Sequence, residues 1–120
     1  MRIPIQLALT YPQRLPSPAK RLSLFDVGQL TFGRADEDTF ICLAAAKKAI
    51  SIGGNAPCIV NSANEAAVAL FLSRKIGFLD IGEAVNAALE SVKNIHEPSL
   101  SDILDTQKAA EEFVRLRFGG

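Results

Sequence analysis

Four prolines crowd the beginning of this chain and limit what its first third can fold into. They are four of the six prolines in the sequence, at Pro4, Pro12, Pro16 and Pro18. Proline has no amide hydrogen to donate and restricts the backbone of the residue before it. The segment YPQRLPSPAKR therefore cannot hold a regular helix. We expect residues 1–35 to form an extended connecting arm.

Two short elements are expected inside this arm. Pro4 is compatible with the first turn of a helix, where its missing amide has no partner to lose, so a short helix is predicted over residues 4–11. Because so short a helix is unstable alone, it needs a neighbour to pack against. The run GQLTFG at residues 28–33, bounded by glycines, predicts one short β-strand.

The pattern changes to helical spacing from Asp38 onward. The apolar residues that share one predicted helix face are Phe40, Leu43, Ala46 and Ile50. Gly53 and Gly54 supply the end of this first helix. A second helix is predicted to begin near Ser62, because Ser62 and Glu65 have the spacing of a capping box. It is expected to end near Gly77, and its alanines (Ala63, Ala66, Ala67 and Ala69) favour close helix packing.

Two further helices complete the prediction. Asp80 and Glu83 indicate a second capping box, followed by apolar residues at helical intervals. The segment His96-Glu97-Pro98 then breaks the chain, and the last helix is expected to begin at Asp105 and to close at Gly119-Gly120. The predicted fold is mainly α: a small four-helix bundle over residues 36–120, preceded by the proline-rich arm with its short helix and one short β-strand.

Charge and composition exclude several classes of protein. Among the 120 residues, 13 basic and 13 acidic side chains cancel, and this argues against nucleic-acid or anionic-membrane binding. The charge is uneven, because residues 1–35 hold five basic side chains and one acidic. No stretch is long and apolar enough to cross a bilayer. Cys42 and Cys58 are too few for a disulfide framework, so we expect buried thiols and a reducing, cytoplasmic location.

Residues suited to catalysis are scarce. The single histidine, His96, falls in a predicted surface loop without partners for a catalytic or metal site. Gly53-Gly54 follows a helix and does not precede one, and no phosphate-binding glycine motif occurs. Asn61 and Asn64 are interpreted as local caps of the second helix. The residues alone therefore predict no catalytic, cofactor-binding or metal-binding residue.

Several segments, in a fixed order, resemble one enzyme family. They are MRIPI, the arm TYPQRLPSP, LTFGRADEDTFICLAAA, NSANEAAVALFL, and IGFLDI followed by VNAALE. The sequence is similar to the C-terminal region of the 1-deoxy-D-xylulose 5-phosphate (DXP) reductoisomerases over nearly all its length, but corresponds to only about the last third of such an enzyme. It departs from the family pattern at Ala35, Ile41 and Ser62, where other residues are usual.

The resemblance implies an activity that belongs to a longer protein. Family members convert DXP to 2-C-methyl-D-erythritol 4-phosphate in non-mevalonate isoprenoid biosynthesis, using NADPH and a divalent metal, manganese or magnesium. By resemblance, the upstream portion binds NADPH and performs catalysis, the full enzyme is a homodimer, and Met1 is an apolar wall of the substrate pocket. The chain is then expected to support the catalytic domain and to be inactive alone.

Other interpretations remain open at this stage. The alternative from another class is a stand-alone helical module that binds a partner protein through the exposed faces of its first and fourth helices. A nucleic-acid adaptor that uses residues 1–35 is a weaker possibility, because the total charge is neutral. If the chain is part of an enzyme, the sequence does not distinguish an engineered piece, a proteolytic fragment and a truncated gene product, nor does it fix the oligomeric state.

Overall fold

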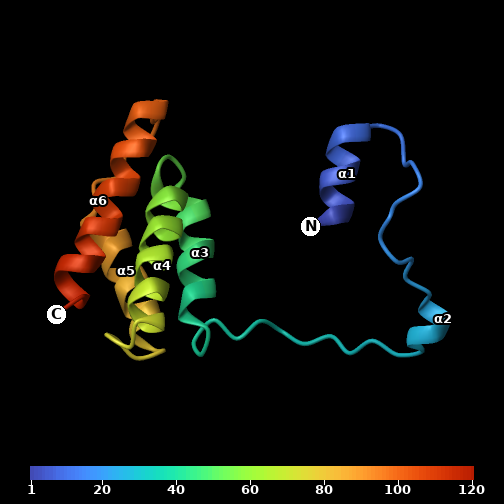
Figure 1. Cartoon of the computed structure of the whole chain (residues 1–120), viewed down its shortest axis with the longest axis horizontal. Coiled ribbons are helices and arrows are strands. Elements are labelled where there is room, and N and C mark those ends of the chain that lie inside the picture. Colours follow the sequence, from blue (N-terminus) through green and yellow to red (C-terminus); the bar gives the residue numbers. More distant parts are fainter. The chain divides into compact units, whose positions relative to one another are not determined.

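The computed structural model describes residues 1–120 and divides them into two compact units, Met1–Arg34 and Ala35–Gly120 (Figure 1). All regular secondary structure is helical, with helices labelled α1 to α6 in chain order. The mainly α prediction is confirmed. The division of roles between an arm and a bundle domain remains a prediction.

The first unit contains two helices, α1 (Arg2–Thr10) and α2 (Leu24–Val27). Pro4 lies in the first turn of α1. After this helix, the Gln6 side-chain amide donates to the carbonyl oxygens of Leu15 and Pro16 at 3.0 and 2.9 Å, which folds the proline-rich segment back along α1. No residue of this unit is buried. Its helices therefore lack the apolar packing that stabilises most short helices.

The predicted β-strand at residues 28–33 is absent, and that prediction was wrong. These residues adopt no regular secondary structure, because a strand requires a partner for its backbone amides and carbonyls and none pairs with them here. Helix α2, immediately before this segment, was not predicted. It is a single turn in which the Ser23 hydroxyl accepts the Asp26 amide at 3.3 Å.

The second unit is a bundle of four helices: α3 (Ile41–Ile52), α4 (Ala56–Leu72), α5 (Asp80–Ser91) and α6 (Leu100–Phe118). Helix α4 lies at the centre and contacts all three others, whereas α3 contacts α4 and α5 but not α6 (Figure 1). As predicted, α3 ends at Gly53, which has a φ of +75° and donates its amide to Ala49.

Helix α4 begins six residues before the predicted position, so the capping box at Ser62 was wrong. Ser62 is buried in the middle of the helix, and Asn55 occupies the N-cap position. Pro57 lies in the first turn, where proline is favoured. Asn61 and Asn64 are accordingly on the helix surface and cap nothing. A serine three residues before a glutamate also occurs in helix interiors, so the spacing alone was misleading.

The starts of the last two helices also differ from the prediction. Leu79 precedes α5, and the Asp80 carboxylate accepts the amide of Gly77 at 2.7 Å and does not cap the helix as predicted. Helix α6 begins at Leu100, five residues before Asp105. Ser99 caps it, because its hydroxyl accepts the Asp102 amide at 3.2 Å while the Asp102 carboxylate accepts the Ser99 amide at 2.8 Å.

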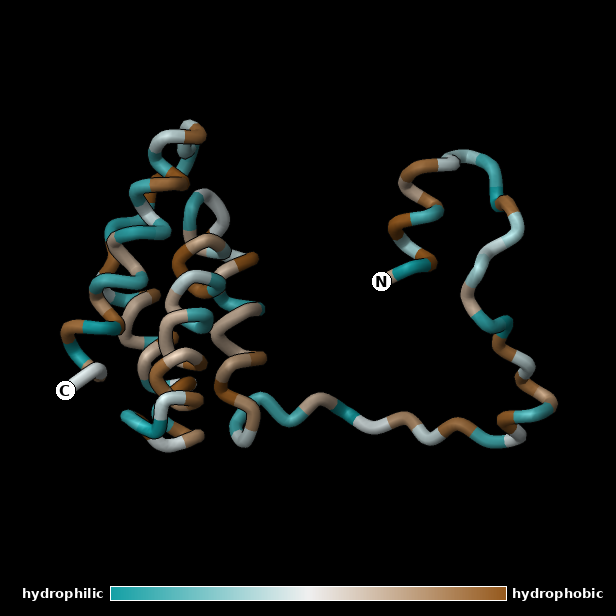
Figure 2. Tube along the Cα trace, viewed as in Figure 1, coloured by the Kyte–Doolittle hydropathy of each residue, from teal (hydrophilic) through white to brown (hydrophobic).

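The core of the bundle is built largely from alanine. Its main cluster comprises Ala45, Ile59, Ala63, Ala66, Ala67, Leu70, Ile81, Ala84, Val85, Ala88, Ala110 and Val114. Small side chains allow the four helices to approach closely, and a few larger residues fill the remaining space. Figure 2 shows that hydrophobic residues are frequent in α3 and α4 and that α6 is more hydrophilic.

One buried polar side chain ties three parts of the bundle together. Asn55 is fully buried, and its side-chain nitrogen donates to the Thr106 hydroxyl at 2.8 Å and to the Lys93 carbonyl at 3.1 Å. Its side-chain oxygen accepts the Ile95 amide at 2.8 Å. Asn55 thus connects the start of α4 to α6 and to the α5–α6 loop. Because its hydrogen bonds are satisfied, its burial is compatible with a stable core.

Candidate functional site

Side chains that could ligate a metal do not gather in the structure. No group of three or more His, Cys, Asp or Glu residues could hold a metal ion. His96 is exposed in the α5–α6 loop, as predicted. Hydrogen bonds lower the pKa of two carboxyls, Asp36 through Thr39 and Asp102 through Ser99. Both carboxyls stabilise turns at helix starts, so neither shift indicates catalytic chemistry.

The arrangement of α3 is the feature that departs most from a self-contained bundle. Phe40, Leu43 and Ile50, which the spacing placed on one helix face, are all exposed. The buried residues of α3 are Ala45 and Ala49. Helix α3 therefore packs on α4 and α5 through its small residues and leaves its larger apolar side chains outside.

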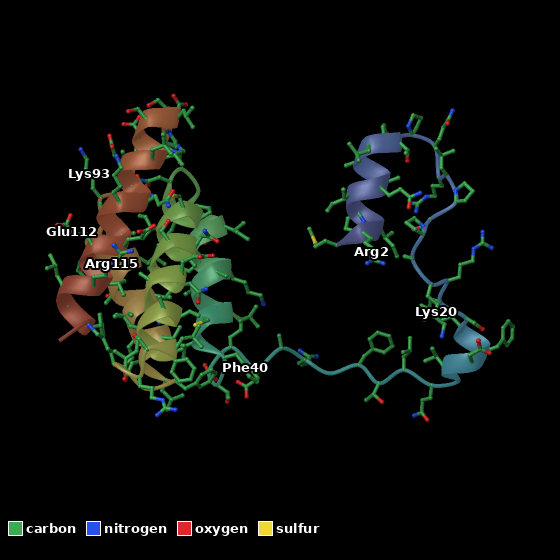
Figure 3. The ribbon with its side chains drawn as sticks, viewed as in Figure 1. Arg2, Lys20, Phe40, Lys93, Glu112 and Arg115 are labelled. Atoms are coloured by element: carbon green, nitrogen blue, oxygen red, sulfur yellow. The ribbon has the colours of Figure 1, made fainter.

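Two neighbouring hollows lie beside this exposed face. One is lined by Cys42, Ala46, Ala49, Ile50, Pro57, Val60, Asn61, Asn64 and Val85. The other, of about 500 Å³, is lined by Asp38, Thr39, Phe40, Ile41, Cys42, Asn64, Val68, Phe78, Leu79, Ile81, Gly82 and Glu83. Because Cys42 and Asn64 line both hollows, the hollows are adjacent, and we call the two together the α3 groove. Figure 3 shows Phe40, one of the lining residues, at the start of α3.

The α3 groove is mainly apolar, and its charged lining residues are Asp38 and Glu83. Lys47 of α3 pairs with Glu37, and Lys48 pairs with Glu90 of α5 at 3.7 Å. The basic side chains of α3 are thus already engaged with acidic partners within the same unit. Such a surface is suited to apolar contact with another protein surface and offers no set of convergent polar groups for a small substrate.

The two cysteines do not behave as the sequence predicted. Cys42 is exposed in the α3 groove, so the expectation that it is a buried thiol was wrong. Cys58 is half-buried, and its thiol donates to the Ile103 carbonyl oxygen at 3.5 Å. Cys42 lies three residues before Ala45 on the same side of α3, so periodicity groups it with the buried alanines, and it is exposed in the first turn of the helix.

The outer surface of α6 differs from the α3 groove. Charged residues follow it in ion pairs one turn apart, Arg115 with Glu111 at 3.0 Å and Lys108 with Asp105 at 3.9 Å. Figure 3 shows Glu112 and Arg115 on this helix. Ion pairs with i,i+3 and i,i+4 spacing are typical of a solvated helix face and contribute little stability.

Met1, the one predicted substrate-binding residue, is at the start of α1 and is 91% exposed. In the same unit, a hollow bordered by α1 and the proline-rich segment is lined partly by the basic residues Arg14, Lys20 and Arg21. Apolar residues (Ile3, Leu7, Leu15 and Leu22) line it as well. Met1 does not line this hollow, and the structure brings no second predicted site residue to it.

Comparison with known proteins identifies the family. The family described as "DXP reductoisomerase C-terminal domain" matches residues 1–113. This chain belongs to the DXP reductoisomerase family. The resemblance seen in the sequence is therefore confirmed, together with the assignment to the C-terminal region.

Individual DXP reductoisomerases give the same result. The enzyme of Agathobacter rectalis is 48% identical over 98% of this chain, and that of Bacillus subtilis is 49% identical over 95% of it. A DXP reductoisomerase structure from Zymomonas mobilis in complex with NADPH is 34% identical, with a TM-score of 0.83 over 98% of this chain. Another, in complex with magnesium, is 32% identical with a TM-score of 0.82 over 98% of this chain.

The matched region is a minor part of each relative. The chain spans about 31% of the Agathobacter rectalis protein and 30% of the Bacillus subtilis protein. It likewise covers 31% of the Zymomonas mobilis structure. In addition, none of the six helices combines the length and apolar character required to cross a membrane.

Proposed function

We propose that this chain is the supporting C-terminal part of an enzyme that converts DXP to 2-C-methyl-D-erythritol 4-phosphate with NADPH and a divalent metal, manganese or magnesium. In this proposal the portion that precedes it in the family binds the cofactor and metal and performs the reaction. The observation that carries the proposal is the match of residues 1–113 to the C-terminal domain of the family.

The residues present support a structural role and no catalytic one. The metal does not fit this chain, because no three metal-ligating side chains come together. No step of the reaction is therefore assigned to its residues. The contribution of the bundle is mechanical: an alanine-packed core holds the exposed surface of α3 in a fixed shape.

We also propose three finer features of the intact enzyme. Met1, exposed at the start of α1, forms an apolar wall of the substrate pocket, as its match to the family's MR-x-PI segment implies. The assembled enzyme is a homodimer. It acts in the cytoplasm, where thiols such as those of Cys42 and Cys58 remain reduced.

A second candidate function is a stand-alone helical module that binds a partner protein. The exposed α3 groove favours it, since apolar surface of this extent is unusual on a protein that acts alone. The first proposal explains the same surface and, in addition, the similarity to family members that extends through the arm.

The test is NADPH oxidation in the presence of DXP and a divalent metal. The chain is assayed alone and after co-production with the part of the Bacillus subtilis enzyme that precedes the matched region, with that part alone as the control. We expect activity only when both are present. Activity of the 120-residue chain alone would contradict the proposed division of labour, and inactivity of the mixture would favour the stand-alone module.

A further inference from the structure

Helix α3 buries its small residues and exposes its large ones. Ile50 is 74% exposed and Phe40, at the start of the helix, is 63% exposed, while Ala45 and Ala49 are each only 1% exposed. Helix α5, of the same length, has the opposite arrangement and buries Ile81, Val85 and Leu89. Exposing large aliphatic side chains costs free energy in water, so the outward face of α3 gains stability from any partner that covers it.

The α3 groove gives this face a definite shape. Its two hollows share Cys42 and Asn64 and extend from Ile50 at one end of α3 to Phe78 and Leu79 beyond the other. Phe78 and Leu79 are also largely exposed. Apolar residues from three segments of the bundle, namely α3, α4 and the Phe78–Leu79 turn, therefore line the groove. It matches a partner segment that presents several large apolar side chains in a row.

The length of the relatives indicates which protein segment covers the α3 groove. The family matches this chain as a C-terminal domain, and the relatives are about three times as long, so the unmatched part of each is mostly N-terminal to it. The lysines of α3 are paired within the bundle, and the charged residues that line the groove are Asp38 and Glu83, so most of its contact with a partner is apolar. An interface inside one enzyme has this character, since it does not have to discriminate among partners.

We propose that the α3 groove is the docking surface for the N-terminal portion of a DXP reductoisomerase, which inserts apolar side chains between α3, α4 and the Phe78–Leu79 turn. This inference rests on the proposed function and adds the location of the contact. The charged surface of α6, on a helix that does not contact α3, stays exposed to solvent.

Exposed leucine and isoleucine residues provide a matched pair of variants. Ile50→Asp places a carboxylate in the groove, whereas Leu116→Asp makes the same kind of change on α6, where Leu116 is 78% exposed. Each variant is co-produced with the N-terminal portion of the Bacillus subtilis enzyme, and binding is measured after purification. Ile50→Asp should weaken binding about tenfold or more, because burying an unpaired carboxylate is costly. Leu116→Asp should bind like the unchanged chain.

Cys42 gives a second measurement that does not depend on a disruptive variant. In a Cys58→Ser chain, Cys42 is the only thiol, and its alkylation by N-ethylmaleimide should slow severalfold in the complex. A control chain carrying Cys42→Ser, Cys58→Ser and Leu116→Cys reports the surface of α6, and its alkylation rate should not change. Circular dichroism of every variant establishes that the helices are intact.

The outcomes separate this inference from the proposed function. If the unchanged chain restores activity but Ile50→Asp binds normally and Cys42 stays reactive, the docking surface is wrong and the proposed function stands. If the unchanged chain neither binds nor restores activity, both fail. If Cys42 becomes protected as the concentration of the chain alone rises, the groove binds a second copy, and the inference is overturned.

Discussion

The two units of this chain have a similar supply of apolar residues but use them differently. In Met1–Arg34 no residue is buried, and Leu9 of α1 is 82% exposed. In Ala35–Gly120 four helices surround a core in which Ile59, Val85 and Val114 are fully buried. The difference is whether a helix packs against other helices of the same unit. A helix with an apolar face and no neighbour gains little from that face.

The largest expected difference between the units is in amide hydrogen exchange. Exchange from the central part of a stable domain requires its unfolding, and exchange from an unpacked helix does not. Amides of α4 and α5 should therefore exchange on the order of 10³-fold more slowly than those of α1, given the usual stability of a domain. Mass spectrometry of peptic fragments measures this. Equal protection of the two units in a monomer would show that the first unit has a stabilising contact of its own.

Shortening one buried and one exposed aliphatic side chain tests the same contrast. Ile59→Ala should lower the free energy of unfolding by about 2–5 kcal/mol, because it removes apolar contacts and leaves a cavity in the core. Leu9→Ala, in α1, should change it by no more than about 0.5 kcal/mol. Urea unfolding followed by circular dichroism gives both values. A comparable loss in the two variants would remove the distinction between the units.

Substituting one glycine in each unit should give a smaller contrast in stability. Gly54 has a φ of +58°, and a Cβ atom there would lie 2.1 Å from the carbonyl oxygen of Ile95. Gly54→Ala should cost about 1–3 kcal/mol through backbone strain and displacement of the α5–α6 loop. A Cβ at Gly33, in the first unit, meets nothing within 4 Å, so Gly33→Ala is the control and should leave the unfolding midpoint unchanged. If Gly54→Ala leaves the free energy of unfolding unchanged, then the α5–α6 loop moves aside without cost.

The smallest effect expected is a change in stability at acid pH. The hydroxyl and amide of Ser99 donate to the Asp102 carboxylate and lower its pKa below the ordinary value. A lowered pKa in the folded state stabilises the fold above the ordinary aspartate pKa of about 4, and this stabilisation disappears as the pH falls through the lower value. Asp102→Asn should therefore flatten the decline in melting temperature on acidification.

Asp26 is the matched control for this measurement. It also lies three residues after a serine, but only its amide is bonded to Ser23. Asp26→Asn, in the first unit, should leave the decline in melting temperature at acid pH unchanged. If Asp26→Asn and Asp102→Asn change this decline equally, then the capping box of α6 is not the source of the acid sensitivity.

The number of helices in the bundle was predictable from sequence, and their beginnings were not. Glycine at positive φ marks the end of α3 clearly, because few other residues adopt that conformation. Helix starts are marked less specifically. Ser62 and Asp80 had the spacing of capping residues, yet the residue that caps α6 is Ser99 with Asp102, a pairing in which aspartate replaces the more usual glutamate.

The candidate site was hidden from sequence for a different reason. Helical spacing correctly grouped Phe40, Leu43 and Ile50 on one side of α3, but it could not tell which side faces the bundle. The choice depends on α4 and α5, whose close packing accepts the alanines of α3. The family itself was recognisable, because several segments in a fixed order resemble the family's motifs, and NSANEAAVALFL is the most specific of them.

The alanine-rich core also bears on how such a chain can change during evolution. Ala63 and Ala67 of α4 are fully buried where the helices pack closely. A larger side chain at either position would overfill the core, so these alanines have few acceptable replacements. Substitutions that enlarge them require simultaneous changes on α5 or α6. Residues on the outer side of α3 are free of that limit and can vary in step with whatever surface they meet. Sequence drift in this bundle is therefore expected to be slow inside and coupled to another protein surface outside.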